Sequence, residues 1–161
     1  MRVEGVITEQ EFFEEGACLC GQVRFKVRGQ PLLTLACHCA GCKRLTASAF
    51  GLAALYPVES LEITDGQPVI GALHGADRHF FCPYCMSWLY NFPHGMEFIA
   101  VRATMLDSAR SFRPFMEVHT SEKLPWATTP AVHSFEKLPL PEELSRLVAE
   151  FTALKGQDPD F

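Results

Sequence analysis

Long hydrophobic runs and an excess of basic residues are both missing from this sequence of 161 residues. The longest apolar stretch, Ala49 to Leu55, is far shorter than the about 20 residues that a membrane-spanning helix needs. Lysine and arginine number 14 against 19 aspartates and glutamates, and the formal net charge is −5. Because binding to nucleic acid over a broad surface requires a basic footprint, we expect neither a nucleic-acid partner nor a membrane partner.

A secretory leader is also missing from the first residues. Met1 to Gly5 is followed by four glutamates before residue 16, so the apolar core of a signal peptide is absent. This predicts a cytoplasmic protein, in which cysteines stay reduced. The seven cysteines therefore favour metal binding over a disulfide framework, which an odd number would leave incomplete.

The composition, 48% apolar and 20% charged, is typical of one folded domain. We expect the acidic residues 1–15 to form a poorly ordered N-terminal arm or edge element, and residues 16–161 to form a single domain. Val23, Phe25 and Val27 alternate with polar residues, as in a half-buried strand. Further strands are predicted at 32–37, 50–55, 61–64, 69–73, 78–81, 88–92 and 98–101. Since glycine and proline separate them, the sequence predicts a mainly β fold of short antiparallel strands.

One helix is predicted near the end of the sequence, over residues 141–155. Its apolar residues recur at helical spacing: Leu140, Leu144, Leu147, Val148, Phe151 and Leu154. Pro141, Glu142 and Glu143 suit its first turn, where a missing N–H costs little and acidic groups complement the helix dipole.

Two cysteine pairs far apart in the chain predict a closed metal site. In an extended segment Cys18 and Cys20 would project from the same side, and Cys82 and Cys85 have the spacing of a zinc knuckle. Four thiolates complete a tetrahedron around zinc, with Zn–S distances of about 2.3 Å. We predict a structural zinc site here, the alternative being free cysteines packed as small hydrophobic side chains.

The remaining cysteines, Cys37, Cys39 and Cys42, form a second cluster, called the trio below. Three thiolates leave one coordination position of a zinc ion free for water or substrate, which is typical of catalytic zinc. The sequence thus predicts two zinc ions with different functions. The alternatives for the trio are a second structural site completed by water and a labile thiol cluster prone to disulfide formation.

Charged and titratable residues adjoin the trio. Alternation along the strand turns His38 away from Cys37 and Cys39, so we interpret it as packed or solvated rather than as a metal ligand, and as a weak candidate for a proton donor. Three thiolates and one Zn²⁺ carry a net charge of −1, which Lys43 and Arg44 can offset. The same two side chains can bind a substrate carboxylate.

Trp126 belongs to another notable segment, Lys123-Leu124-Pro125-Trp126. We interpret this tryptophan as buried over the core rather than as a ligand contact.

The cysteine clusters resemble those of the glutathione-dependent formaldehyde-activating enzyme family, whose domain is shared with centromere protein V. The similar segments are Gly16–Phe25, Cys37–Thr46 and Phe81–Cys85, followed by Leu106-Asp107, Pro114 and Lys123–Trp126. They cover about Gly16 to Pro139 in order, and three such clusters at these spacings are a specific signal. The resemblance implies a zinc-binding Mss4-like β fold, structural zinc on the four outer cysteines and catalytic zinc on the trio.

Two positions depart from the pattern of that family. Met86 stands where the family usually has glycine, and a left-handed backbone there would cost a larger residue about 1–2 kcal/mol. Ala47 stands at another position where the family favours glycine, and we expect it to narrow the floor of the substrate pocket. Neither departure removes a predicted metal ligand.

The resemblance implies a carbon–sulfur lyase similar to S-(hydroxymethyl)glutathione synthase. Such an enzyme adds glutathione or a similar thiol to formaldehyde or a related small aldehyde, and zinc would stabilise the thiolate. The competing hypothesis is a non-enzymatic zinc-binding or redox-responsive module that uses the trio as a switch. Only the enzyme would accelerate adduct formation over the uncatalysed mixture.

Overall fold

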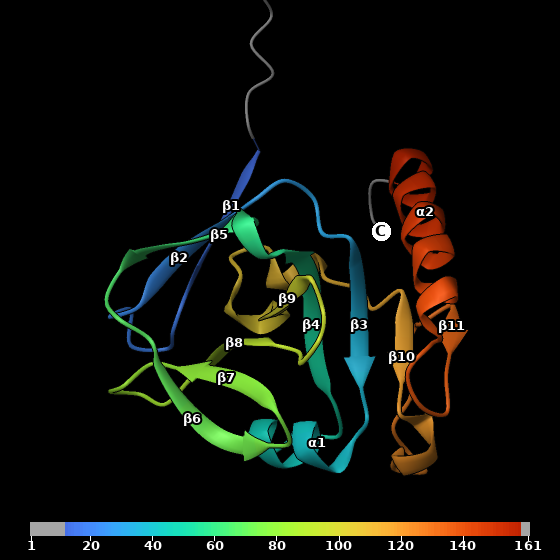
Figure 1. Ribbon diagram of the computed structural model, residues 1–161, viewed down its shortest axis with the longest axis horizontal. Helices are drawn as coiled ribbons and strands as arrows, with labels where there is room; N and C mark the ends of the chain where they lie inside the picture. The colour runs from blue at the N-terminus through green and yellow to red at the C-terminus, as the bar shows by residue number, and fades with distance from the viewer. Residues whose placement is uncertain (1–11, 159–161) are drawn as a thin grey trace, which may run out of the picture.

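Two β-sheets and two α-helices make up the described part of the chain (Figure 1). A computed structural model describes residues 12–158, without the side chains of residues 72–74. The predicted N-terminal arm falls largely outside this part, because residues 1–11 are not described. Neither α-helix of the described chain has the length and apolar character needed to cross a bilayer.

The small sheet has the strand order β1-β2-β5 and the large sheet the order β11-β10-β3-β4-β9-β8-β7-β6. The strands are β1 Phe13–Ala17, β2 Arg24–Arg28, β3 Leu33–Cys37, β4 Gly51–Pro57, β5 Leu61–Asp65, β6 Val69–His74, β7 Asp77–Phe81, β8 Trp88–Phe92, β9 Phe98–Arg102, β10 Met116–Val118 and β11 His133–Ser134. The α-helices are α1 Ala40–Thr46 and α2 Pro141–Gln157, and the short 3₁₀ helices are η1 Val58–Ser60, η2 Ala103–Met105, η3 Ala109–Ser111 and η4 Thr120–Glu122.

The prediction of a mainly β fold with a C-terminal helix is confirmed. Each of the eight predicted strands is present with its ends shifted by at most two residues, and α2 runs two residues beyond the predicted end. The expectation of antiparallel pairing needs one correction. Strand β10 lies parallel to both β3 and β11, since the chain returns to this edge of the sheet in the same direction as β3.

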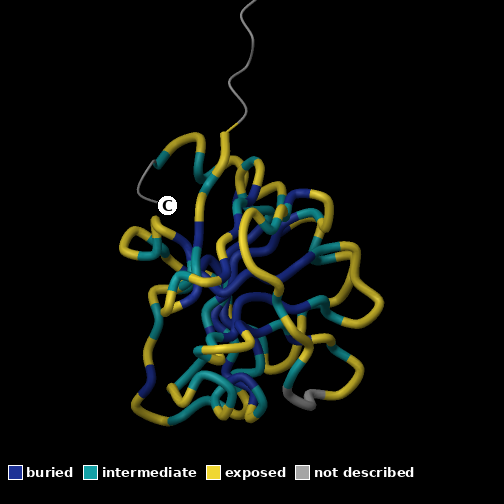
Figure 2. Tube along the Cα trace, turned by 90° about the vertical axis from the view of Figure 1, so that its left-hand side faces the viewer, coloured by how far each residue is buried: buried dark blue, intermediate teal, exposed yellow. Residues whose placement is uncertain are grey.

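Strand β4 lies at the centre of the large sheet and is buried on both faces. Figure 2 shows the buried residues, in dark blue, gathered in the middle of the molecule. Ala54 and Tyr56 face the small sheet, where they pack with the alternating Phe25 and Val27 of β2. The opposite face of β4 belongs to a second cluster that includes Leu147 and Phe151 of α2. Burying each large side chain stabilises the fold by roughly 1.5–3 kcal/mol, so the large sheet is held between the small sheet and the helix.

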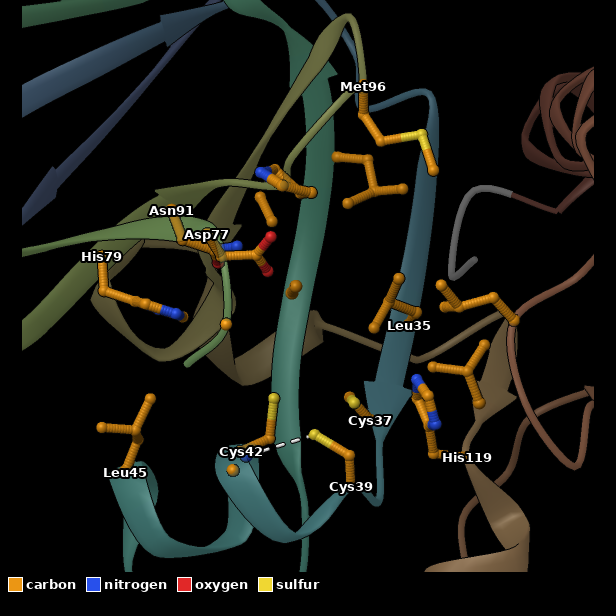
Figure 3. Close-up of a pocket in the computed structure, with 18 of the residues that line it drawn as sticks. Leu35, Cys37, Cys39, Cys42, Leu45, Asp77, His79, Asn91, Met96 and His119 are labelled. Carbon is orange, nitrogen blue, oxygen red and sulfur yellow. Dashed lines mark hydrogen bonds between the residues drawn. The ribbon is translucent and has the colours of Figure 1, made fainter. Parts of the chain in front are cut away.

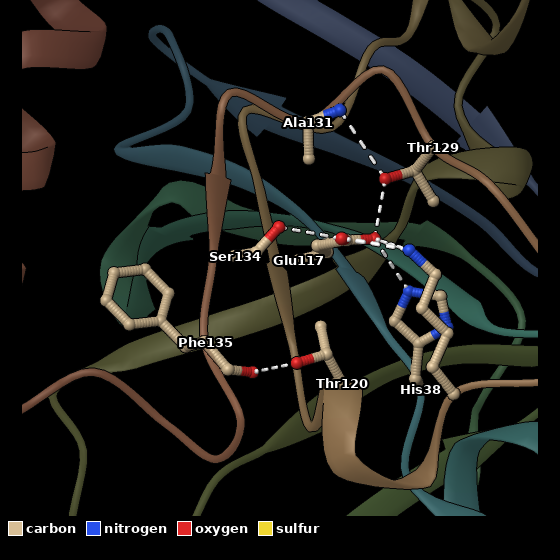
Figure 4. A network of polar contacts seen from close by, with 8 residues as sticks. His38, Glu117, Thr120, Thr129, Ala131, Ser134 and Phe135 are labelled. Atoms are coloured by element: carbon tan, nitrogen blue, oxygen red, sulfur yellow. Dashed lines mark hydrogen bonds and ion pairs between the residues drawn. The ribbon is translucent and has the colours of Figure 1, made fainter.

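A buried carboxylate, that of Glu117 in β10, joins four segments behind β3 (Figure 4). The carboxylate accepts hydrogen bonds from Thr129 at 2.8 Å and Ser134 at 2.7 Å, and lies 3.0 Å from Lys123 Nζ. His38 Nε2 lies 3.0 Å from the same carboxylate. These contacts fix the chain after β10 against the segment that connects β3 to α1.

The pKa of Glu117 reflects this network. Burial raises the pKa, but the hydrogen bonds from Ser134, Lys123 and Thr129 lower it by more, to about 2. The carboxylate therefore stabilises the fold fully above the pKa of an unfolded glutamate, about 4.3, and this stabilisation is lost as the pH falls towards 2.

We predict that Glu117→Gln lowers the free energy of unfolding by about 3 kcal/mol at neutral pH, since an amide cannot replace a charged acceptor of several donors. Denaturant unfolding at several pH values measures this, and the difference from the unaltered protein should shrink between pH 4.5 and 2. The matched control is Glu62→Gln, which removes an exposed ion pair to Lys26 in the small sheet. Equal losses in both variants would contradict the central role of Glu117.

Candidate functional site

Cys18, Cys20, Cys82 and Cys85 form the first candidate metal centre. Their sulfurs all lie within 4.8 Å of one another, with Cys18 Sγ at 3.5 Å from Cys20 Sγ and Cys20 Sγ at 3.8 Å from Cys82 Sγ. Sulfurs bound tetrahedrally at about 2.3 Å from zinc lie about 3.8 Å apart. The four thiols therefore fit a zinc ion closely.

Short turns orient the sulfurs of this centre, and the extended segment expected at Cys18 and Cys20 is wrong, because the Gly21 N–H donates to the Cys18 carbonyl oxygen at 3.0 Å and closes a turn. The backbone N–H of Val23 donates to Cys18 Sγ at 3.3 Å, and the Ser87 hydroxyl lies 3.2 Å from Cys85 Sγ. Burial raises the pKa of Cys85, but the hydrogen bonds from Ser87 and backbone groups lower it by more, to about 5. Met86 has a φ of 58°, so the left-handed backbone that the missing glycine suggested is present.

The trio forms the second candidate centre, at the junction of β3 and α1. Cys37 ends β3, Cys39 is the N-cap residue of α1, and Cys42 lies one turn into the helix, where its N–H donates to Cys39 Sγ at 3.3 Å. The three sulfurs lie within 4.8 Å of one another. The short helix was not predicted, yet it brings Cys42 back to the other two sulfurs.

The ionisation of the trio requires a positive charge nearby. Hydrogen bonds with Cys39 and Cys42, together with burial, raise the pKa of Cys37. A hydrogen bond with Cys37 lowers the pKa of Cys42, but Cys39 and burial outweigh it and raise the value to about 11. Three adjacent thiolates are thus unfavourable at neutral pH without a cation, and a zinc ion would supply one.

Arg102 of β9 provides a second, built-in positive charge. Burial lowers the pKa of Arg102, and the charges of Cys42 and Cys37 oppose that shift. Its Nη2 donates to Asn91 Oδ1 at 3.0 Å, and its guanidinium lies 4.0 Å from the centre of the Trp88 ring. One arginine and one Zn²⁺ together balance the charge of three thiolates.

Glycine at position 51 makes room for this contact. A Cβ at Gly51 would lie 3.3 Å from Cys42 Cβ and 3.4 Å from Arg102 Nη1. Any side chain there would therefore crowd the space where the guanidinium reaches the trio.

A pocket of about 720 Å³ opens beside the trio (Figure 3). Its floor is one face of the large sheet, where Leu35 pairs with Ala53 and Ala53 pairs with Arg102. The next row continues from Ala100 to Asn91 and then to His79. Figure 3 shows the three sulfurs at one end of this pocket and Met96 at the other. The small side chains of Ala53 and Ala100, at the centre of the floor, leave the cavity open.

The residues predicted beside the trio lie in different places in the structure, and only one of them lines the pocket. Arg44 is exposed and lines the pocket, whereas Lys43 donates a hydrogen bond to the carbonyl oxygen of Glu122 and lies outside the pocket. His38 is buried and turned to Glu117, as alternation predicted, so it lies away from the pocket.

Two predictions about neighbouring residues are wrong. Trp126 is 72% exposed, because the chain after η4 runs over the surface, and the ring lines a separate groove with Lys43. Ala47 caps α1 with a φ of 49° and turns the chain away, so it does not narrow the floor of the pocket.

Several residues of the pocket were not found by sequence reasoning. Arg102, Asn91, His79 and His119 all line it, yet each stands alone among strand or turn residues. Arg102 carried the clearest signal, since an arginine that continues the apolar strand Phe98–Val101 must find a partner when buried.

One known protein family has a model that matches most of the chain. The model of the family described as glutathione-dependent formaldehyde-activating enzyme matches residues 13–122, which are 110 of the 161 residues and include all seven cysteines. Among solved structures, a Rhodobacter sphaeroides protein is similar at 22% identity with a TM-score of 0.49. That similarity covers 58% of this chain and 87% of the other. No curated protein matches the chain.

The two cysteine clusters should respond differently to substitution. Cys82→Ala removes a buried ligand of a closed site, so we predict an unstable or insoluble protein, because structural zinc contributes folding free energy. Cys42→Ser should keep the fold and one tightly held zinc. Metal analysis and thermal unfolding of both variants measure this, and a stable, fully loaded Cys82→Ala protein would refute it.

Removal of the buried arginine should weaken zinc binding at the trio alone. We predict that Arg102→Gln lowers the affinity of the trio for zinc about 10- to 100-fold, since a charge-assisted partner of the thiolates is lost. Competition with a chelator measures both sites in one titration. The control is Arg78→Gln, which removes another arginine that lies over an aromatic ring, that of Phe92 at 5.1 Å. Unchanged affinity in Arg102→Gln would exclude this role.

Proposed function

Because this chain belongs to the glutathione-dependent formaldehyde-activating enzyme family, we propose that it is a zinc-dependent carbon–sulfur lyase acting as a synthase. It would add a thiol such as glutathione to formaldehyde or a related aldehyde. The observation that carries the proposal is that the trio forms part of the wall of the 720 Å³ pocket, whereas the four-cysteine cluster lies outside that pocket. A three-ligand centre needs such an opening if substrate is to reach its free position.

The residues around the trio suit this addition. A zinc ion held there would keep an incoming thiol deprotonated. Asn91 uses its carbonyl oxygen to fix Arg102, so its amide N–H groups remain available as donors in the same pocket. Arg102 and Asn91 can thus stabilise the negative charge that develops on the carbonyl oxygen of the aldehyde.

We assign the proton donor to His119. It follows Val118, which pairs with Cys37, and its half-buried side chain lines the pocket near the trio (Figure 3). His79 lines the pocket too, but it is almost fully buried and packs on Trp88 with ring centres 5.0 Å apart. A half-buried imidazole that lines the pocket can exchange its proton with solvent between turnovers, which favours His119.

Arg44 is the proposed anchor for a carboxylate of the thiol. Its exposed guanidinium stands at the pocket and makes no ion pair among the described residues. Glutathione carries two carboxylates, which a chain of net charge −5 must attract locally. A cytoplasmic location would suit both the reduced cysteines of the chain and glutathione as a co-substrate.

The enzyme and the redox switch differ in one measurement. We predict that the zinc-loaded protein accelerates the formation of the adduct of glutathione and formaldehyde, followed by NMR against the uncatalysed mixture. Cys42→Ser should abolish this acceleration, and His119→Gln should reduce it. If the unaltered protein only changes its metal content or oligomeric state on addition of thiol, the switch is the correct function.

Arg44→Ala should raise the dissociation constant of glutathione about fivefold, or about 1 kcal/mol, as expected for one partly solvated charge contact. Calorimetric titration at moderate salt measures this. The matched control is Arg110→Ala, which removes an exposed arginine outside the pocket. Equal affinities in both variants would rule out Arg44 as the anchor.

A further inference from the structure

The pocket has two chemically distinct halves. The trio, Arg102 and Asn91 lie in the half where reaction would take place. The other half, called the apolar bay below, runs between the sheet and the start of α2. Its side chains are Leu35, Leu55, Met96, Phe98, Met116 and Leu144.

The apolar bay does not suit the charged parts of glutathione. Burying a carboxylate without a partner is very costly, and the side chains of the bay offer no donor. The exposed cation at the pocket, Arg44, lies on α1 at the end where the trio is found. The thiol therefore fits between the trio and Arg44, which leaves the bay for the other reactant.

Formaldehyde leaves the bay empty because it carries no substituent on its carbonyl carbon. The pocket volume of about 720 Å³ is in the range of sites for complete small molecules, so the pocket has room for the thiol and for a second reactant larger than formaldehyde. The floor of the bay includes a small residue, Ala100, which pairs with Leu55.

We propose that the aldehyde substrate carries an apolar substituent, aliphatic or aromatic, that occupies the apolar bay. This inference rests on the proposed function and names its substrate class. The thiolate sulfur forms a bond to the carbonyl carbon, the C=O π bond breaks, and the oxygen takes one proton. Nothing is oxidised or reduced, so no further reactant is needed.

The first test uses the zinc-loaded protein with glutathione and the series propanal, pentanal and heptanal. After division by the uncatalysed rate, kcat/KM should rise about fourfold for each added methylene, because each buried CH₂ contributes about 0.8 kcal/mol. A flat series with measurable turnover of formaldehyde would overturn the inference and leave the proposed function standing.

A second measurement separates the inference from the proposed function. Propanamide, pentanamide and heptanamide are unreactive carbonyl analogues, and calorimetry should give affinities that rise with chain length in the same way. Rising affinities without any catalysis would support the apolar bay and overturn the synthase. If glutathione alone displaced heptanamide from the bay, the assignment of the bay to the aldehyde would be wrong.

Two substitutions in the apolar bay test whether the substituent of the aldehyde binds there. Leu35→Gln should reduce the ratio of heptanal to propanal kcat/KM at least tenfold, since a neutral polar group enters the bay without a new charge near the trio. Leu144→Gln, in the first turn of α2, tests the opposite wall if the first variant does not fold. The matched control is Ile70→Gln on the edge strand β6, where the side chain is 64% exposed and outside the pocket. An unchanged ratio in both bay variants would refute the proposal.

Discussion

Three cysteine sulfurs within 4.8 Å of one another impose a charge constraint that the surrounding structure meets. The neighbouring thiols and burial raise the pKa values of Cys37 and Cys42, so ionisation of the site needs positive charge close to the sulfurs. Buried Arg102 supplies this positive charge. Its guanidinium is held in place by a hydrogen bond to Asn91 and by the ring of Trp88. The absence of a side chain at Gly51 allows the approach. One electrostatic requirement therefore explains an arginine, an amide, an indole ring and a glycine on three neighbouring strands.

The backbone positions of the trio depend on contacts behind the sheet. Cys37 and Cys39 flank His38, which is held by Glu117, and the start of α1 is held by Glu122, whose carboxylate accepts from the Ala40 N–H at 2.5 Å. Both acids follow β3 in sequence by many residues. The parallel pairing of β10 with β3 brings them there. Segments that contain no cysteine thus contribute to the positions of the trio.

The strands with regular alternation, such as β2, and the amphipathic helix α2 could be predicted because each carries its own periodic pattern. Strands β10 and β11 could not, since two or three residues contain no measurable period and their pairing is long-range. Helix α1 contains a glycine and spans only seven residues, and its stability comes from the Cys39 cap rather than from propensity.

The same distinction applies to the candidate site. Spacing identified both cysteine clusters, because local geometry fixes which sulfurs can meet. Arg102 and His119 reach the trio only through strand pairing, which the sequence does not state. Trp126 was misplaced because a large aromatic side chain is usually buried, yet here Lys123 binds Glu117 and the tryptophan three residues on remains outside.

The family match ends at residue 122, whereas Leu138 and Leu144, on the far wall of the pocket, lie beyond it. The trio and part of the pocket wall are therefore encoded in successive stretches of the gene. Insertions, deletions or recombination in the last forty or so codons could reshape the cavity while every cysteine codon stays untouched. A lineage that carries this fold could change which molecules the pocket binds through changes in the residues after 122. Proteins with the same cysteines therefore need not bind the same molecules.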